Sequence, residues 1–290
     1  MTFKAYRSVL LFYAMILTVL LTNAQQLPVD ENKISRKFPQ LSLIFNRIFN
    51  NSSLDSFYGK LQQLKKSEKG LVTIVHIGDS HLQSDNLTGV VRKGMQDFFG
   101  DAGSGIIFPH DLSNLEYPNK KDSTGVQYQT IGINGARYET FNNFADFWQK
   151  LTPLHADLFI VSLGTNDAQT NAYNDSEFQK QVTSLLDNLR KTSPSAAILV
   201  TTTADSFKGG YPNRELWNIN LSLFSYCTTN NIPVWDMYRV TNGFGSAYNW
   251  LRKGMMNGDG IHFTANAYKI QGQLLFAALA KGYNNYVNSY

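Results

Sequence analysis

The chain has 290 residues, of which 43% are hydrophobic, 13% aromatic and 17% charged, a composition that supports one large packed core and excludes an intrinsically disordered protein. The formal net charge is +4, and the only basic cluster, Lys65-Lys66 with Lys69, is short, so we expect no nucleic-acid partner. Cys227 is the sole cysteine, which excludes an internal disulfide bond.

The first 24 residues have the layout of a secretory signal peptide. Lys4 and Arg7 precede the apolar stretch Val9–Leu21, and Thr22-Asn23-Ala24 offers a cleavage site. The apolar stretch is short for a membrane span, although an uncleaved membrane anchor is the alternative. No cysteine lies near the cleavage site, which argues against a lipoprotein. We therefore expect residues 1–24 to be removed on export. Removal lowers the formal charge from +4 to +2 and leaves a periplasmic or extracellular protein without a stable membrane span.

A short N-terminal region is expected in front of the main domain. Residues 25–69 should form a lead-in and two helices, and residues 70–290 the main domain. Apolar residues at helical spacing predict a short helix over residues 41–50. A second helix is predicted over residues 54–67, with Ser53 as its N-cap.

Beyond residue 70 the hydrophobic patterns of strands and helices alternate. Strands are predicted at residues 71–77, 127–133, 158–163, 196–202 and 232–235, and helices at residues 87–98, 178–189, 216–227 and 266–280. Strands separated by helices pair in parallel, with helices on both faces. We therefore predict an α/β fold, a three-layer α/β/α sandwich around a mainly parallel five-stranded sheet. Residues 101–125, which hold three glycines and two prolines, are interpreted as an insertion beside the functional site.

A serine follows the first predicted strand. Gly78-Asp79-Ser80-His81 comes directly after the apolar run of residues 71–77, so the Ser80 hydroxyl is expected at the carboxyl end of a buried strand. In open α/β sheets, ligands bind at that end. Because a serine is a poor nucleophile at neutral pH, Ser80 would need an adjacent base to take its proton.

Asp259 and His262 can supply such a base. They lie three residues apart in a glycine-rich turn just before the last predicted helix. This spacing lets the carboxylate reach one ring nitrogen while the other nitrogen faces the serine. Taken alone, the same residues also fit a plain turn at the start of a helix.

Two further turns can supply hydrogen-bond donors for the negative charge that develops on an attacked carbonyl. Asn166 follows the strand at residues 158–163, and Gly135 follows the strand at residues 127–133. Each could be an ordinary turn residue. Together with Ser80 they provide three donors: the N–H groups of Ser80 and Gly135 and the Asn166 side chain.

These ordered motifs resemble those of the SGNH (GDSL-like) hydrolase family. The matching residues are Gly78-Asp79-Ser80, Gly135, Gly164-Thr165-Asn166-Asp167 and Asp259-Gly260-Ile261-His262. The resemblance covers most of residues 70–282 and implies a flavodoxin-like α/β/α fold. It also implies that Ser80 is the nucleophile, His262 the base and Asp259 its partner, with an oxyanion hole formed by Ser80, Gly135 and Asn166.

The residue after the nucleophile departs from the family name, because His81 stands in place of leucine. The run Gly78–Asp85 looks like exported bacterial members that include peptidoglycan O-acetylesterases. His81 is interpreted either as a pocket residue or as a histidine hydrogen-bonded to backbone, and Asp79 as a brace for the turn.

The remaining histidines and aromatics admit simpler interpretations. His76 fits a core residue, and His110 and His155 lack partners at metal-ligand spacing, so we expect no metal site and no cofactor. Arg137 is either a contact for an anionic substrate or an exposed cation. Four aromatic residues either stack on sugar or pack in the core: Tyr211, Trp217, Trp235 and Trp250.

We therefore predict an exported serine esterase that removes short acyl groups, foremost O-acetyl, from a polysaccharide such as peptidoglycan. An acylated carbohydrate or another ester is the expected partner. The alternatives are a lipase or lysophospholipase, an acyltransferase on the same site, or a catalytically silent carbohydrate-binding protein.

Overall fold

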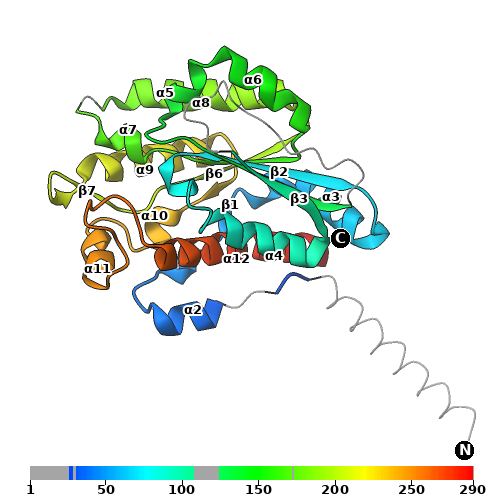
Figure 1. The fold of residues 1–290 in the computed structure, drawn as a ribbon, viewed down its shortest axis with the longest axis horizontal. Coiled ribbons are helices and arrows are strands. Elements are labelled where there is room, and N and C mark those ends of the chain that lie inside the picture. Colours follow the sequence, from blue (N-terminus) through cyan, green and yellow to red (C-terminus); the bar gives the residue numbers. More distant parts are fainter. Residues whose placement is uncertain (1–25, 29–30, 108–123, 172, 290) are drawn as a thin grey trace, which may run out of the picture.

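The computed structural model describes residues 26–28, 31–107, 124–171 and 173–289 (Figure 1). The predicted signal peptide lies outside these residues, as does most of the predicted insertion. Within the described ranges, no helix combines the length and apolar character needed to cross a membrane.

The core of the molecule is a seven-stranded, mostly parallel sheet. Its strands, in spatial order, are β1 (Ile48–Phe49), β9 (Val234–Trp235), β6 (Ala197–Thr201), β5 (Leu158–Ser162), β2 (Leu71–Gly78), β4 (Gly125–Gly132) and β3 (Asp101–Ile107). Only the β1–β9 pair is antiparallel among the pairs of this sheet. The α/β prediction is confirmed, but the sheet has seven strands rather than five.

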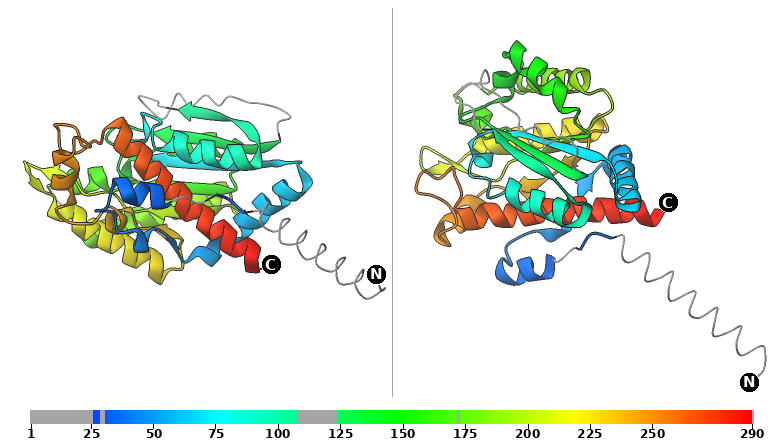
Figure 2. Two further views of the ribbon diagram at one scale, coloured as in Figure 1. Left: turned by 90° about the horizontal axis from the view of Figure 1, so that it is seen from below. Right: turned by 45° about the vertical axis from the view of Figure 1, so that its right-hand side comes forward.

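Helices cover both faces of this sheet (Figures 1 and 2). One face packs on α3 (Asp55–Ser67), α4 (Thr88–Phe99) and α12 (Ala265–Ser289). The other packs on α5 (Tyr138–Asn142), α6 (Ala145–Leu151), α8 (Asp175–Thr192) and α9 (Arg214–Thr229). Along β2, Val72 and Ile74 join the first cluster, whereas Val75 and Ile77 join the second. Both faces of β2 are therefore buried, which explains its continuous apolar run.

The remaining short elements lie around this sandwich. They are α2 (Glu31–Lys37), α7 (Thr165–Gln169), α10 (Met237–Val240), α11 (Ser246–Arg252), the hairpin strands β7 (Phe207–Lys208) and β8 (Tyr211–Pro212), and the 3-10 helices η1 (Leu43–Phe45), η2 (Asn51–Leu54), η3 (Ser80–Leu82) and η5 (Thr152–Leu154). Figure 2 shows α2 on the outer side of α12.

The predicted helix over residues 41–50 is wrong, because this segment forms η1 and the edge strand β1. Asn46 between them is buried, and its amide nitrogen donates to the Leu274 carbonyl at 3.1 Å. Its amide oxygen accepts the Trp235 indole N–H at 2.8 Å. These bonds to α12 and β9 override the local helical spacing, as tertiary contacts often do.

Two smaller expectations also fail. Ser53 does not cap α3, since its hydroxyl donates to the Asn231 carbonyl at 3.0 Å. The first part of the predicted insertion is β3, which pairs with β4 across a register shift between Asp101 and Ser104. Its glycine- and serine-containing sequence carries no strand signal, and pairing with β4 supplies the order.

Candidate active site

Ser80 lies directly past the carboxyl end of β2. The strand ends at Gly78, where an added Cβ would lie 2.7 Å from the Ser162 carbonyl oxygen, so only glycine fits. Asp79 is in an extended conformation and caps η3 by accepting the His81 N–H at 2.9 Å. The close approach of β2 to β5 therefore fixes where the serine leaves the sheet.

The structure places Ser80, His262 and Asp259 in one hydrogen-bonded chain. Ser80 Oγ lies 2.8 Å from His262 Nε2, and His262 Nδ1 lies 2.7 Å from Asp259 Oδ2. Asp259 Oδ1 accepts the N–H groups of Ile261 and His262, each at 2.9 Å. Partial burial opposes ionisation of Asp259, but these bonds outweigh it and lower the pKa of the carboxyl. The charged Asp259 holds the proton on Nδ1, which leaves Nε2 free to accept the serine proton.

The loop that carries Asp259 and His262 is anchored by the β7–β8 hairpin. The Phe207 N–H donates to the Gly260 carbonyl at 2.8 Å. Gly260 has φ +69°, and an added Cβ would meet the Phe207 ring at 2.9 Å. The turn thus requires glycine both for its left-handed backbone and for the close approach of the hairpin.

Asn166 lies in α7, just past the end of β5. Its side chain connects the two segments that carry the other predicted donors, Ser80 and Gly135. Its Nδ2 donates to Asp79 Oδ2 and to the Ala136 carbonyl, each at 3.1 Å. Asp79 precedes Ser80, and Ala136 follows Gly135, which has φ +69° and open space around it. The structure therefore brings the three predicted oxyanion-hole residues to one edge of the sheet. Because both amide hydrogens are engaged, donation to a substrate oxygen requires Asn166 to share or exchange one of these bonds.

A second histidine–carboxylate pair, Asp79 with His81, was not predicted as a pair. The Asp79 side chain is only 2% exposed, and its Oδ1 lies 2.8 Å from His81 Nδ1. His81 Nε2 lies 3.3 Å from the Ile261 carbonyl, and the ring stacks on His262 with a centroid distance of 5.1 Å. Burial alone would lower the pKa of His81, but the Asp79 carboxylate and the Ile261 carbonyl outweigh it and raise the pKa. The departure from leucine at position 81 was the one sequence signal of this pair.

Asp167, next to Asn166, was also missed as a perturbed group. Its Oδ1 accepts the Tyr138 N–H at 3.4 Å, and its buried Oδ2 has no hydrogen-bond partner among the described residues. Burial raises the pKa of this carboxyl to about 7. Arg137, which lines a 90 Å³ pocket with Asp167, is half-exposed and pairs with Glu139 at 3.0 Å.

The other sequence candidates separate into core and surface. His76 is buried between Tyr128 and Ser162, and burial lowers its pKa to about 3, as fits a core residue. Trp235 and Trp250 are each 1% exposed, whereas Tyr211 is 74% and Trp217 46% exposed. In the part of the chain that the structure describes, no cluster of three or more His, Cys, Asp or Glu side chains could hold a metal ion; His110 lies outside it.

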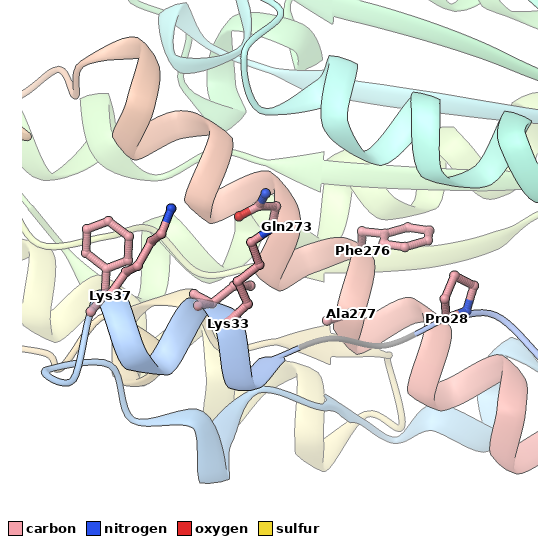
Figure 3. A pocket seen from close by; sticks show the side chains of 8 residues that line it. Pro28, Lys33, Lys37, Gln273, Phe276 and Ala277 are labelled. Atoms are coloured by element: carbon pink, nitrogen blue, oxygen red, sulfur yellow. The ribbon is translucent and has the colours of Figure 1, made fainter.

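A separate groove of about 370 Å³ lies between α2 and α12. Figure 3 shows side chains that line it, among them Lys33, Lys37 and Phe276. None of the predicted site residues lines this groove, so it is distinct from the Ser80 site.

Solved structures with the same fold include several esterases. A peptidoglycan O-acetylesterase matches with a TM-score of 0.69 and 20% identity, over 81% of this chain and 97% of the other. A carbohydrate esterase family 3 protein from Talaromyces cellulolyticus matches with a TM-score of 0.53 and 14% identity, over 74% and 99%. A lipase/acylhydrolase from Enterococcus faecalis matches with a TM-score of 0.50 and 17% identity, over 72% and 96%. At these identities the likeness shows the fold.

The sequence itself gives the family. A comparison with curated proteins found no matching sequence. The model of the GDSL-like lipase/acylhydrolase family matches residues 78–270, which hold all the predicted site residues from Ser80 to His262. Since this match spans most of the chain, the protein belongs to the GDSL-like lipase/acylhydrolase family and is a carboxylic ester hydrolase.

Proposed function

We propose that the protein is an exported serine esterase that removes short acyl groups, foremost O-acetyl, from a polysaccharide such as peptidoglycan. The observation that carries the proposal is the hydrogen-bonded chain from Ser80 Oγ through His262 to the Asp259 carboxylate. Export is supported by the N-terminal sequence pattern, a cationic start followed by an apolar stretch and small residues.

The reaction follows from the order of the groups in this chain. His262 Nε2 takes the Ser80 proton as Oγ bonds to the ester carbonyl carbon, and Asp259 stabilises the imidazolium that forms. The N–H groups of Ser80 and Gly135 and the Asn166 amide donate to the carbonyl oxygen while it carries negative charge. The imidazolium then protonates the leaving alcohol as the ester C–O bond breaks. Water, deprotonated by His262, releases the acid from the acyl-enzyme and restores the Ser80 hydroxyl.

A polymeric carbohydrate substrate is supported by a surface that we call the aromatic surface: Tyr211, Trp217, Phe244 and Tyr248. Of the nine large hydrophobic side chains exposed in the described residues, six lie between residues 211 and 251, and these four are among them. We take this concentration along one segment of the chain as support for a binding surface there. Aromatic faces pack against the C–H faces of sugar rings and bury apolar area there.

The aromatic surface is joined to the catalytic loop. The Tyr248 ring packs edge-on against Phe207 at a centroid distance of 4.9 Å, and Phe207 binds Gly260 through its backbone. Trp217 and Phe244 contact each other at 6.1 Å. Figure 1 shows β7 and α11 at the same end of the molecule, beside the segment that leads into α12. Tyr248 thus connects the aromatic surface to the loop that carries Asp259 and His262.

The catalytic part is tested with p-nitrophenyl acetate, a small ester that needs no glycan site. We expect wild-type protein to hydrolyse it, Ser80→Ala to lose nearly all turnover, and Asn166→Ala to lose about 100- to 1000-fold in kcat. A fluorophosphonate probe should label wild-type protein at Ser80 but not the Ser80→Ala variant. Equal hydrolysis by wild type and Ser80→Ala would refute the proposal.

The substrate part is tested by acetate release from O-acetylated peptidoglycan and O-acetylated plant glycans. Trp217→Ala should lower kcat/KM on the preferred glycan about tenfold, which corresponds to ~1.4 kcal/mol of lost stacking, and leave p-nitrophenyl acetate hydrolysis unchanged. Phe144→Ala is the matched control, since Phe144 is also exposed, at 40%, but lies between α5 and α6. Preference for long-chain p-nitrophenyl esters over all glycans would favour a lipase instead.

A further inference from the structure

Both ring nitrogens of His81 face atoms that only accept hydrogen bonds. Nδ1 lies 2.8 Å from Asp79 Oδ1, and Nε2 lies 3.3 Å from the Ile261 carbonyl oxygen. Asp79 also accepts the His81 N–H and an Asn166 amide hydrogen, so its carboxylate acts as an acceptor throughout. A neutral imidazole carries only one hydrogen and would point a lone pair at one of these oxygens. Both contacts are satisfied together only when His81 is an imidazolium, which agrees with the raised pKa of this ring.

His81 and Asp79 are largely shielded from solvent in the middle of the site. The His81 side chain is 17% exposed and that of Asp79 2%. A buried ion pair is costly unless its hydrogen-bonding groups are satisfied, and here the side-chain hydrogen bonds of the pair lead to Asn166 and to the loop that carries Asp259 and His262. Asp79 contacts Asn166 on one side, and His81 contacts Ile261 and His262 on the other.

The contact with Ile261 bears directly on the position of the base. Ile261 precedes His262, and its N–H donates to Asp259 Oδ1. His81 thus contacts the backbone between Asp259 and His262. The Phe207 N–H binds the Gly260 carbonyl of the same loop from the β7–β8 hairpin. Without His81, this anchor of the loop is lost.

We propose that His81 is a cationic positioning residue that holds the Asp259–His262 loop against Ser80 and keeps His262 in its neutral, proton-accepting form. This inference rests on the proposed function of Ser80 and His262. The stacked rings are 5.1 Å apart, with an interplanar angle of 29°. A positive charge at that distance disfavours a second positive charge on His262 and offsets part of the opposite effect of Asp259.

Among the described residues, few charged or titratable groups lie near His81. Asp79 faces it from η3, Asp259 and His262 from the loop before α12, and Tyr268 from α12, edge-on at 5.9 Å. Burial raises the pKa of Tyr268 above its ordinary value, so this phenol adds no charge beside His81. Loss of the His81 charge would leave the two carboxylates, and both favour protonation of His262.

The first test is the pH dependence of kcat/KM with p-nitrophenyl acetate. His81→Gln keeps a donor for one partner without the charge, and His81→Leu removes both. We expect the acidic limb of the profile to move up by about 1 pH unit in both variants, so that activity at pH 6 relative to pH 8 falls several-fold. His81→Leu should also lower kcat at pH 8 more than His81→Gln does, because leucine cannot donate a hydrogen bond to the Ile261 carbonyl. Unchanged limbs with a uniform loss of kcat would overturn the electrostatic role.

The second test needs no turnover. Nitrogen-15 NMR of the histidine rings in the wild-type protein, assigned by comparison with His81→Gln, should show both His81 nitrogens protonated at pH 7. A neutral His81 ring at that pH would overturn the inference even if Ser80 proves essential. Conversely, an imidazolium at His81 in a protein whose hydrolysis does not depend on Ser80 would indicate failure of the proposed function alone.

Discussion

The two segments that meet in the active site are built differently. The segment from Gly78 to His81 is part of the core: Gly78 is confined by the Ser162 carbonyl, and the Asp79 side chain is almost fully buried. The loop with Asp259 and His262 is open, with these side chains 46% and 34% exposed. Packing of the sheet thus fixes the serine, whereas a few specific hydrogen bonds fix the base. Substitutions on the two sides should therefore separate stability from activity.

The largest separation is expected for Asp259→Asn on the open side. The amide can no longer hold the proton on His262 Nδ1, so we expect kcat to fall by about 10³- to 10⁴-fold. The free energy of unfolding should change by less than about 1 kcal/mol, because Asp259 is half-exposed. Ester hydrolysis and urea denaturation measure the two quantities. Activity within tenfold of wild type would contradict the assignment of Asp259 as the partner of His262.

A smaller but opposite effect is expected for Gly78→Ala on the core side. The new methyl group would lie 2.7 Å from the Ser162 carbonyl oxygen, so the strand end must shift. We expect about 1–3 kcal/mol of lost stability and roughly tenfold lower kcat from a displaced Ser80. Gly258→Ala is the control in the open loop, since an added Cβ there meets no atom within 4 Å. If both variants were equally stable, the contrast between the two segments would be wrong.

The same contrast explains which features the sequence could predict. Ser80 and Asn166 follow β2 and β5, whose apolar runs are strong local signals, and parallel strands bring their carboxyl ends to one edge. Asp259 and His262 are close in sequence, so their mutual geometry is local. The resemblance to the family motifs was needed to predict that the Ser80 segment and the Asp259–His262 loop meet in one site.

Features that depend on distant contacts could not be predicted. The His81–Ile261 hydrogen bond joins residues 180 positions apart, and nothing in the local pattern decides between a pocket and a backbone contact for His81. The strand β1 depends on the bonds of Asn46 to Trp235 and Leu274. Likewise, hydrophobicity alone does not distinguish the buried Trp235 from the exposed Trp217.

The smallest effect concerns two carboxyl groups whose pKa values move in opposite directions. Hydrogen bonds lower the pKa of Asp259 despite partial burial, whereas burial raises that of Asp167 to about 7. The folded protein therefore binds a proton at Asp167 that the unfolded chain has already released between about pH 4 and pH 7. Stability must fall as the pH rises through this window, and the loss is complete above pH 7.

Asp167→Asn should remove that loss. We expect the variant to be more stable than wild type by about 1–3 kcal/mol at pH 8 and equal to it at about pH 3, below the ordinary Asp pKa, where the wild-type carboxyl is mostly protonated in both states. Urea denaturation at the two pH values measures this difference, with the exposed Asp187→Asn on α8 as the matched control. A variant with no gain at pH 8 would mean that the Asp167 carboxylate finds solvent or a partner in the folded protein. The buried side of the site would then be more open than the unpartnered Oδ2 implies.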